Sequence, residues 1–160
     1  MSAIREQLWE TAKKSLLSFG ELTPESVIAA RAPDCQHRIF PTTMGHPTRT
    51  NAEWAEFIME LKKTMPDVRY IIPDDFEPII DERKKAVFTY VKSASNTTVG
   101  PYANQYFMAF RMNEDGTQIK EIIEYVDTLV ANELVTRSGI QEMVASDDAG
   151  RPTWAGAGVE

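Results

Sequence analysis

The stretch YANQYFMAFRMNEDGTQIKEIIEYVD, residues 102–127, decides the fold. Its centre, residues 113–117, fits a type I turn followed by a glycine in the left-handed region, which is a common hairpin loop. Two antiparallel strands are therefore predicted, Tyr102–Asn113 and Thr117–Asp127. If Asn113 faces Thr117, the hairpin register pairs Tyr106 with Glu124, Met108 with Ile122 and Tyr102 with Thr128.

Side chains alternate across a strand, so each face of this hairpin has its own set of residues. One face carries Tyr102, Asn104, Tyr106, Met108 and Glu124. The other face carries Ala103, Phe107, Ala109, Ile119, Ile123 and Tyr125. Both faces are partly apolar. We expect helices to cover the first face and a second copy of the chain to cover the other, which predicts a homodimer.

Upstream of the hairpin the apolar period of two continues back to Val68. It predicts strands over residues 68–72, 76–81 and 85–95, and a further short strand over 36–40. Before residue 68 the period is mostly helical. The predicted helices are residues 4–19, ended by Gly20, a short one begun by Thr23-Pro24-Glu25 and broken by Pro33, and one opened by the capping box Thr50–Glu53 and closed by Pro66.

Helices followed by consecutive strands predict an α+β fold, with N-terminal helices packed on one face of a curved antiparallel sheet. Downstream of the hairpin, Leu129–Arg137 continues as a helix ending at Gly139. Residues 1–145 are expected to form one domain. Residues 146–160 are rich in Asp, Gly and Ala, so we expect a flexible C-terminal tail.

Composition narrows the class of protein. The 160 residues are 42% hydrophobic, and the net charge of −7 disfavours nucleic acid and anionic membrane as partners. The lone cysteine, Cys35, excludes an internal disulfide. The longest apolar run, Tyr106–Phe110, is far too short to span a membrane, and charges interrupt the first 19 residues where a signal peptide would lie. We expect a cytoplasmic protein.

Motifs for common cofactors are lacking in the sequence. It has no glycine-rich phosphate loop, nucleophile elbow or HExxH pattern. His37 and His46, even with Asp34 and Cys35, match no usual metal-ligand spacing, and we interpret them as ordinary loop and strand residues. A Cys35–His37 catalytic dyad is equally unsupported, and Cys35 is interpreted as a buried apolar residue. No metal or cofactor is expected.

Glu124 interrupts an otherwise apolar strand on the face assigned to the helices. A carboxyl buried there would have a raised pKa, which suits a general acid or base. Arg38 is a candidate partner or a cation for a developing oxyanion, and Tyr102 and Tyr106 are candidate hydrogen-bond donors. The alternative is a structural Arg–Glu pair with two core tyrosines, which spacing alone favours. Trp54 and Phe57 are interpreted as core, or as pocket lining.

Several segments resemble a known family. They are RAPDCQHR at 31–38, Pro41 with Gly45, Asn51 with Glu53, GPYANQY at 100–106 and IEYVD at 123–127. Over roughly residues 1–134 the chain resembles the SnoaL-like branch of the NTF2-like superfamily, which implies a cone-shaped α+β barrel with an apolar pocket. It is most similar to small fungal members from natural-product pathways. That group includes isomerases and cyclases of meroterpenoid assembly and the semi-pinacolase of brevianamide-type indole alkaloids, which is closest in pattern.

The resemblance implies catalytic roles for Arg38, Glu124, Tyr102 and Tyr106, no cofactor, and a homodimer. The substrate-binding residues expected with them are Trp54, Phe57, Asn104, Met108 and Phe40. The expected function is a cofactor-independent semi-pinacol rearrangement of an oxidised indole alkaloid, a small biosynthetic intermediate. The alternatives are a meroterpenoid or polyketide isomerase or cyclase, and a non-catalytic NTF2-like binding or dimerisation module. The aspartate base of SnoaL polyketide cyclases has no located counterpart here.

Overall fold

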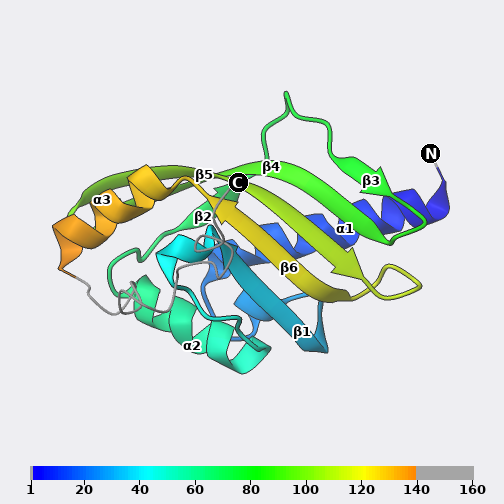
Figure 1. The fold of residues 1–160 in the computed structure, drawn as a ribbon, viewed down its shortest axis with the longest axis horizontal. Helices are drawn as coiled ribbons and strands as arrows, with labels where there is room; N and C mark the ends of the chain where they lie inside the picture. The colour runs from blue at the N-terminus through cyan, green and yellow to red at the C-terminus, as the bar shows by residue number, and fades with distance from the viewer. Residues whose placement is uncertain (1, 140–160) are drawn as a thin grey trace, which may run out of the picture.

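The computed structural model describes residues 2–139, and the expected tail at 146–160 lies outside them. Within these described residues, three α-helices and a six-stranded sheet make up the fold (Figure 1). The helices are α1 (Ala3–Ser18), α2 (Asn51–Lys62) and α3 (Thr128–Ser138). The strands are β1 (Arg31–Phe40), β2 (Arg69–Ile71), β3 (Ile79–Asp81), β4 (Ala86–Thr97), β5 (Gly100–Met112) and β6 (Ile119–Val126).

The helix ends follow the sequence signals. Ser2 accepts a hydrogen bond from the Arg5 backbone N–H at the start of α1, and Thr50 and Glu53 form the predicted capping box of α2. Helix α3 ends at Gly139, whose φ of 69° is the left-handed conformation that glycine tolerates best. These three predicted helices are confirmed.

The predicted short helix after Thr23 is wrong, because only a 3₁₀ turn forms at Ser26–Ile28. Ala30 then takes a positive φ of 62°, which redirects the chain, and β1 begins at Arg31 rather than at residue 36. Pro33 lies exposed inside this strand, where the pairing register is irregular.

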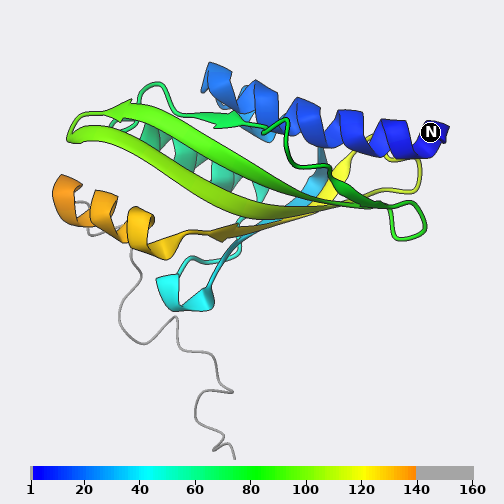
Figure 2. The same cartoon turned by 90° about the horizontal axis from the view of Figure 1, so that it is seen from above.

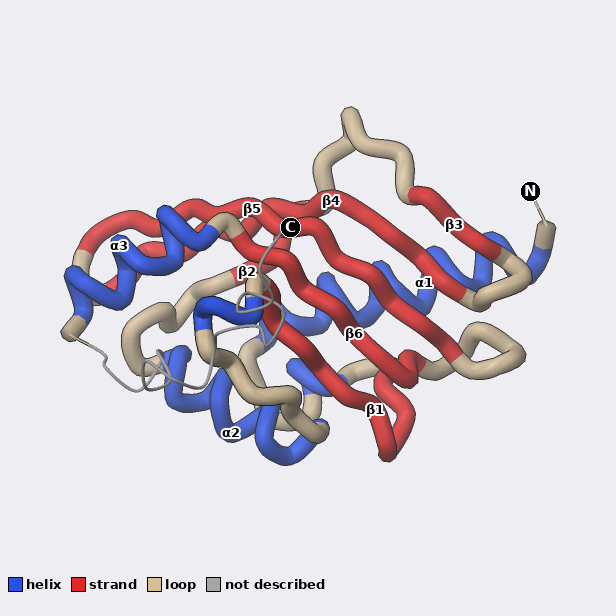
Figure 3. The backbone as a smooth tube through the Cα atoms, viewed as in Figure 1, coloured by secondary structure: helices blue, strands red, loops and turns tan. Residues whose placement is uncertain are grey.

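The sheet is mixed rather than wholly antiparallel. Its order is β1-β6-β5-β4-β2, with β3 paired to β4, and β1 runs parallel to β6 while the other pairs are antiparallel. Figure 3 shows β5 and β6 in the middle of the sheet, between β1 and β4. A strand from the start of the chain thus pairs with the last one, so their residues meet across a long sequence separation. The α+β fold class is confirmed.

The two sheet faces differ in their covering. Figure 2 shows α1 running along one face, which we call the inner face. Buried side chains of β4, β5 and β6 on this face join α1 and α2 in one core that includes Leu8, Trp54, Val91, Phe110 and Ile122. The opposite, outer face keeps exposed aromatic side chains such as Phe107 and Tyr125.

The predicted hairpin register is wrong by two residues. Tyr106 pairs with Val126 and Met108 with Glu124, because the loop spans residues 113–118 and a bulge follows between the Arg111 and Met112 pairs. Side chains alternate between the two faces, so a shift of two residues leaves every β5 side chain on its predicted face. The same holds for the β6 side chains from Glu121 onward, which lie past the bulge. Ile119 precedes the bulge on its strand, so it lies fully buried in the core instead of on the outer face.

Candidate active site

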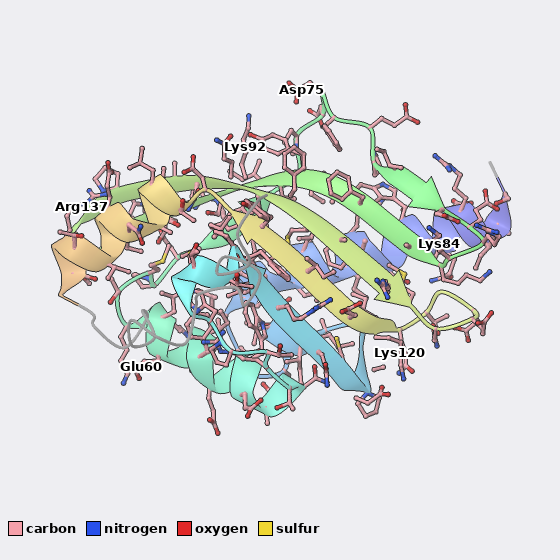
Figure 4. All side chains as sticks on the ribbon, viewed as in Figure 1. Glu60, Asp75, Lys84, Lys92, Lys120 and Arg137 are labelled. Atoms are coloured by element: carbon pink, nitrogen blue, oxygen red, sulfur yellow. The ribbon has the colours of Figure 1, made fainter. Side chains whose placement is uncertain are left out.

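A cavity of about 380 Å³ lies between the inner sheet face and the helices α2 and α3. This volume falls within the usual range for small-molecule sites. Most of its wall is apolar, with Trp54 and Phe57 from α2 and Leu134 from α3. The polar wall includes Tyr70, Ser93, Tyr102, Tyr106 and Glu124. Among the described residues that line the cavity, Glu124 is the acidic one. Figure 4 shows labelled charged residues such as Lys92, Lys120 and Arg137 pointing outward from the body of the protein.

Glu124 is the buried carboxyl of β6, with 6% of the residue exposed. Its Oε2 lies 3.0 Å from Nε2 of His37 and 3.5 Å from the hydroxyl of Tyr70. Behind it, Nδ1 of His37 lies 3.1 Å from the NH2 nitrogen of Arg31. Residues from β1, β2 and β6 therefore converge on a single carboxyl group.

Burial raises the pKa of Glu124 to about 7, against the opposing effects of the Arg31 charge, the Tyr70 hydrogen bond and the Arg49 charge. Burial, with the charges of Arg31, Arg49 and His46, lowers the pKa of His37 well below its usual value. A carboxyl that titrates near neutrality can both take and return a proton under physiological conditions. This is the arrangement that suits general acid–base chemistry.

The tyrosines supply neutral donors. Burial raises the pKa values of Tyr70, Tyr102 and Tyr106, so their phenols stay protonated. The Tyr102 oxygen accepts a hydrogen bond of 2.6 Å from Nδ2 of Asn104, and Tyr106 pairs with the Ser93 hydroxyl at 2.9 Å. Asn104 thus stands behind Tyr102 rather than in the cavity wall.

The structure brings five of the predicted site residues together. Glu124, Tyr102, Tyr106, Trp54 and Phe57 line the cavity together. Met108 is buried in the core beneath the site, outside the cavity lining.

Arg38 and Phe40 are misplaced by the sequence prediction. In β1 they lie opposite Ile123 and Tyr125, on the outer face, because alternate residues of a strand point to opposite sides. The Arg38 guanidinium pairs there with Glu121 at 2.5 Å and packs over the Phe40 ring. Neither side chain lines the cavity, so the predicted oxyanion role of Arg38 has no geometric basis.

Sequence reasoning missed Arg31, His37 and Tyr70. The alternation of Cys35, His37 and Ile39 would have placed His37 on a buried face, and all three are buried. Nothing in the spacing indicates that this face meets Glu124, because His37 and Glu124 are 87 positions apart.

Among residues 2–139, no group of three or more His, Cys, Asp or Glu side chains is arranged to hold a metal ion. Within the same residues, no helix is both long and apolar enough to cross a membrane.

Comparison with known proteins identifies the family, although no family model matches the chain. The chain is 30% identical over 129 residues to austinoid biosynthesis clusters protein H of Penicillium brasilianum, covering 80% of this chain and 88% of that protein. It is 32% identical over 127 residues to austinoid biosynthesis clusters protein S of Emericella nidulans, covering 79% and 89%.

Solved structures agree in fold. BvnE pinacolase from Penicillium brevicompactum superposes with a TM-score of 0.81 at 26% identity, covering 85% of this chain and 96% of that one. AusH from Aspergillus nidulans gives a TM-score of 0.73 at 28% identity, covering 78% and 86%. On these similarities, the chain belongs to the SnoaL-like branch of the NTF2-like superfamily, among its fungal secondary-metabolite biosynthesis proteins.

Proposed function

We propose that this protein is a cofactor-independent isomerase of fungal secondary metabolism, with Glu124 as its general acid–base group. Membership of the family supports isomerase or cyclase chemistry in natural-product biosynthesis. The observation that carries the proposal is the Glu124 carboxyl, with a pKa raised to about 7 by burial, in the wall of a largely apolar cavity. Water excluded from such a cavity cannot compete for the proton or trap a reactive intermediate.

The reaction that we propose is a semi-pinacol rearrangement of an oxidised indole alkaloid carrying a hydroxyl group next to a C=N bond. Glu124 removes the hydroxyl proton, and the O–H electron pair forms a C=O bond. The migrating C–C bond moves to the neighbouring imine carbon, and the C=N π electrons pass to the nitrogen. The nitrogen regains the proton that Glu124 took. Substrate and product therefore have equal mass, and no oxidant or reductant is needed.

The phenols orient the substrate oxygen in this proposal. Because Tyr102 accepts from Asn104, its own O–H is available to donate into the cavity. Tyr106 shares its hydroxyl with Ser93, which fixes the ring beside Glu124. Neutral donors of this kind stabilise an oxygen that gains charge as its proton leaves. They take the role that the sequence assigned to Arg38.

Similarity to BvnE pinacolase supports the semi-pinacol reaction. A second candidate is isomerisation or cyclisation of a meroterpenoid, which the higher identity to the austinoid cluster proteins favours. The same carboxyl and phenols would serve either reaction, since both need a positioned proton acceptor in a dry cavity.

The test is product analysis by chromatography and mass spectrometry. Purified protein is incubated with a 3-hydroxyindolenine alkaloid and, separately, with a meroterpenoid cyclisation precursor. A new peak of unchanged mass from the alkaloid, lost in Glu124→Gln, supports the proposal. Conversion of the meroterpenoid alone selects the second candidate. Tight binding of either compound without conversion would indicate a non-catalytic binding module.

A further inference from the structure

The Arg31–His37–Glu124 chain fixes where one hydrogen lies. An arginine guanidinium has only donors, so the Nδ1 of His37 at 3.1 Å from Arg31 must be an acceptor. The imidazole is then neutral and carries its hydrogen on Nε2, which donates to Oε2 of Glu124 at 3.0 Å.

The His37 ring is held in this orientation. It stacks on Trp54 with ring centroids 3.6 Å apart and an interplanar angle of 13°. Its backbone N–H and C=O exchange two hydrogen bonds of 2.9 Å with Arg49. With 2% of the residue exposed, His37 has little room to turn.

The two oxygens of Glu124 are consequently unequal. Oε2 accepts from His37 and is the atom nearest the Tyr70 hydroxyl, whereas no group in residues 2–139 donates to Oε1. Glu124 lines the cavity, so Oε1 is the oxygen left for a ligand.

We propose that Arg31 and His37 are positioning residues that confine proton exchange to Oε1 of Glu124 and prevent His37 from taking the proton itself. The catalytic part of this inference rests on the proposed function. Arg31 acts through His37, since its hydrogen bond occupies the only basic nitrogen of the ring. The proton that leaves the substrate then stays on the cavity side of Glu124, where it can be returned to the product.

The charged and titratable groups around the pair favour this outcome. Arg31 from β1 and Arg49 from the segment before α2 act on both Glu124 and His37, and His46 acts on His37. The charges of the two arginines disfavour an imidazolium and favour the Glu124 carboxylate. Tyr70 from β2 and the phenols of Tyr102 and Tyr106 from β5 are neutral near pH 7, so they do not reverse this balance.

The first test requires no substrate and no measurement of enzyme activity. Protein labelled with ¹⁵N-histidine is examined by NMR between pH 5 and 8, and the His37 signals are assigned by their loss in His37→Gln. The expected result is a neutral ring with hydrogen on Nε2 throughout this range. A ring that carries hydrogen on Nδ1, or that titrates near 6.5, overturns the inference.

The second test measures the Glu124 titration directly from ¹³C-labelled glutamate, with the signal assigned by its loss in Glu124→Gln. Arg31→Gln and His37→Leu each remove a group that stabilises the carboxylate, so the midpoint should rise by about one to three pH units. His37→Gln keeps an N–H donor, so it should shift the Glu124 midpoint less than His37→Leu does. Arg38→Gln is the matched control, because Arg38 lies on the same strand but on the outer face, and it should leave the midpoint unchanged.

The rate of rearrangement supplies the catalytic readout. If Glu124 acts as a base, kcat/KM falls as pH drops through the pKa of Glu124. In Arg31→Gln this acidic limb of the pH–rate profile should move to higher pH, together with the ¹³C titration midpoint. Unchanged midpoints in Arg31→Gln and His37→Leu overturn the inference even if the enzyme is active. Wild-type rates in Glu124→Gln with the expected tautomer would instead overturn the proposed function and leave the hydrogen-bond arrangement standing.

Discussion

Two glutamates on strand β6 lie three residues apart and have opposite surroundings. Glu121 points to the outer face, where it pairs with the guanidinium groups of Arg38 and Arg111. Glu124 points to the inner face, where its hydrogen-bond partners are the His37 imidazole and the Tyr70 phenol. The first carboxyl is balanced by two permanent positive charges close to water. The second has only neutral donors in contact with it, and the guanidinium of Arg31 acts on it from behind His37.

This difference shows why residue type alone does not reveal function. A carboxylate paired with two arginines serves as a structural anchor. A carboxyl buried without a directly bonded cation titrates near neutrality and can exchange protons. Because side chains of one strand alternate between the two sheet faces, the same amino acid on β6 has both kinds of surroundings.

Replacing each glutamate with glutamine should give the largest difference between the two sites. Glu124→Gln keeps the shape of the side chain and removes proton transfer, so turnover should fall by about 10²–10⁴-fold. Glu121→Gln, the matched control on the outer face, should keep the wild-type rate. Single-turnover rates are measured beside thermal melting, and an equal loss in both variants would contradict the contrast between the two faces.

Stability against pH provides a second test. The folded pKa of Glu124 is raised from 4.5 to about 7, so its contribution is greatest below pH 4.5 and is lost as pH rises to about 7. Relative to Glu124→Gln, the wild type should lose about 1.4 kcal/mol per pH unit within this window. His37, whose pKa is lowered, has the opposite effect, and therefore the difference between the two proteins is the quantity to measure.

Urea unfolding of the wild type, Glu124→Gln and Glu121→Gln at pH 4.5, 5.5, 6.5 and 7.5 gives this difference. Glu121→Gln leaves the Glu124–His37 pair intact and should follow the wild-type pH profile. A constant difference between wild type and Glu124→Gln would show that Glu124 is not the group with the raised pKa.

The next largest effect is expected from substitutions on the outer face, where we propose that the chain dimerises. Phe107 is 46% exposed and Tyr125 54%, and we propose that a second copy of the chain covers them. Ile123 lies on the same face, two residues before Tyr125 on β6 and opposite Ala109, so Ile123→Asp should weaken association by about 2 kcal/mol or more. Light scattering should give a wild-type mass of twice 18.1 kDa.

Leu17→Asp serves as the control for this substitution, since Leu17 is an exposed apolar residue of helix α1. It should leave the dimer intact. A wild-type mass near 18.1 kDa at micromolar concentration would contradict the proposed dimer.

Arg38→Ala should have the smallest effect. The Arg38–Glu121 pair is partly exposed, and such pairs contribute about 0–1 kcal/mol to stability. Arg38 does not line the cavity, so the turnover rate should be unchanged. A large loss of rate in a well-folded Arg38→Ala protein would support the role that the sequence pattern suggested and would contradict the placement of Arg38 on the outer face.

Local signals in the sequence determined much of this protein. The capping box at Thr50–Glu53, the glycine that ends α3 and the turn at Asn113–Gly116 depend on neighbouring residues, and the structure forms each of them. The inward direction of Glu124 was also predictable, because a register error of two residues preserves the alternation of faces.

Tertiary structure alone decided which residues surround that carboxyl. The parallel pairing of β1 with β6 turns His37 inward and Arg38 outward, and it joins segments separated by helix α2 and four other strands. A pairing of this kind depends on how the whole sheet closes around its core, and no local period or motif encodes it. The sequence therefore indicated the buried carboxyl, while the fold placed Arg31, His37 and Tyr70 around it.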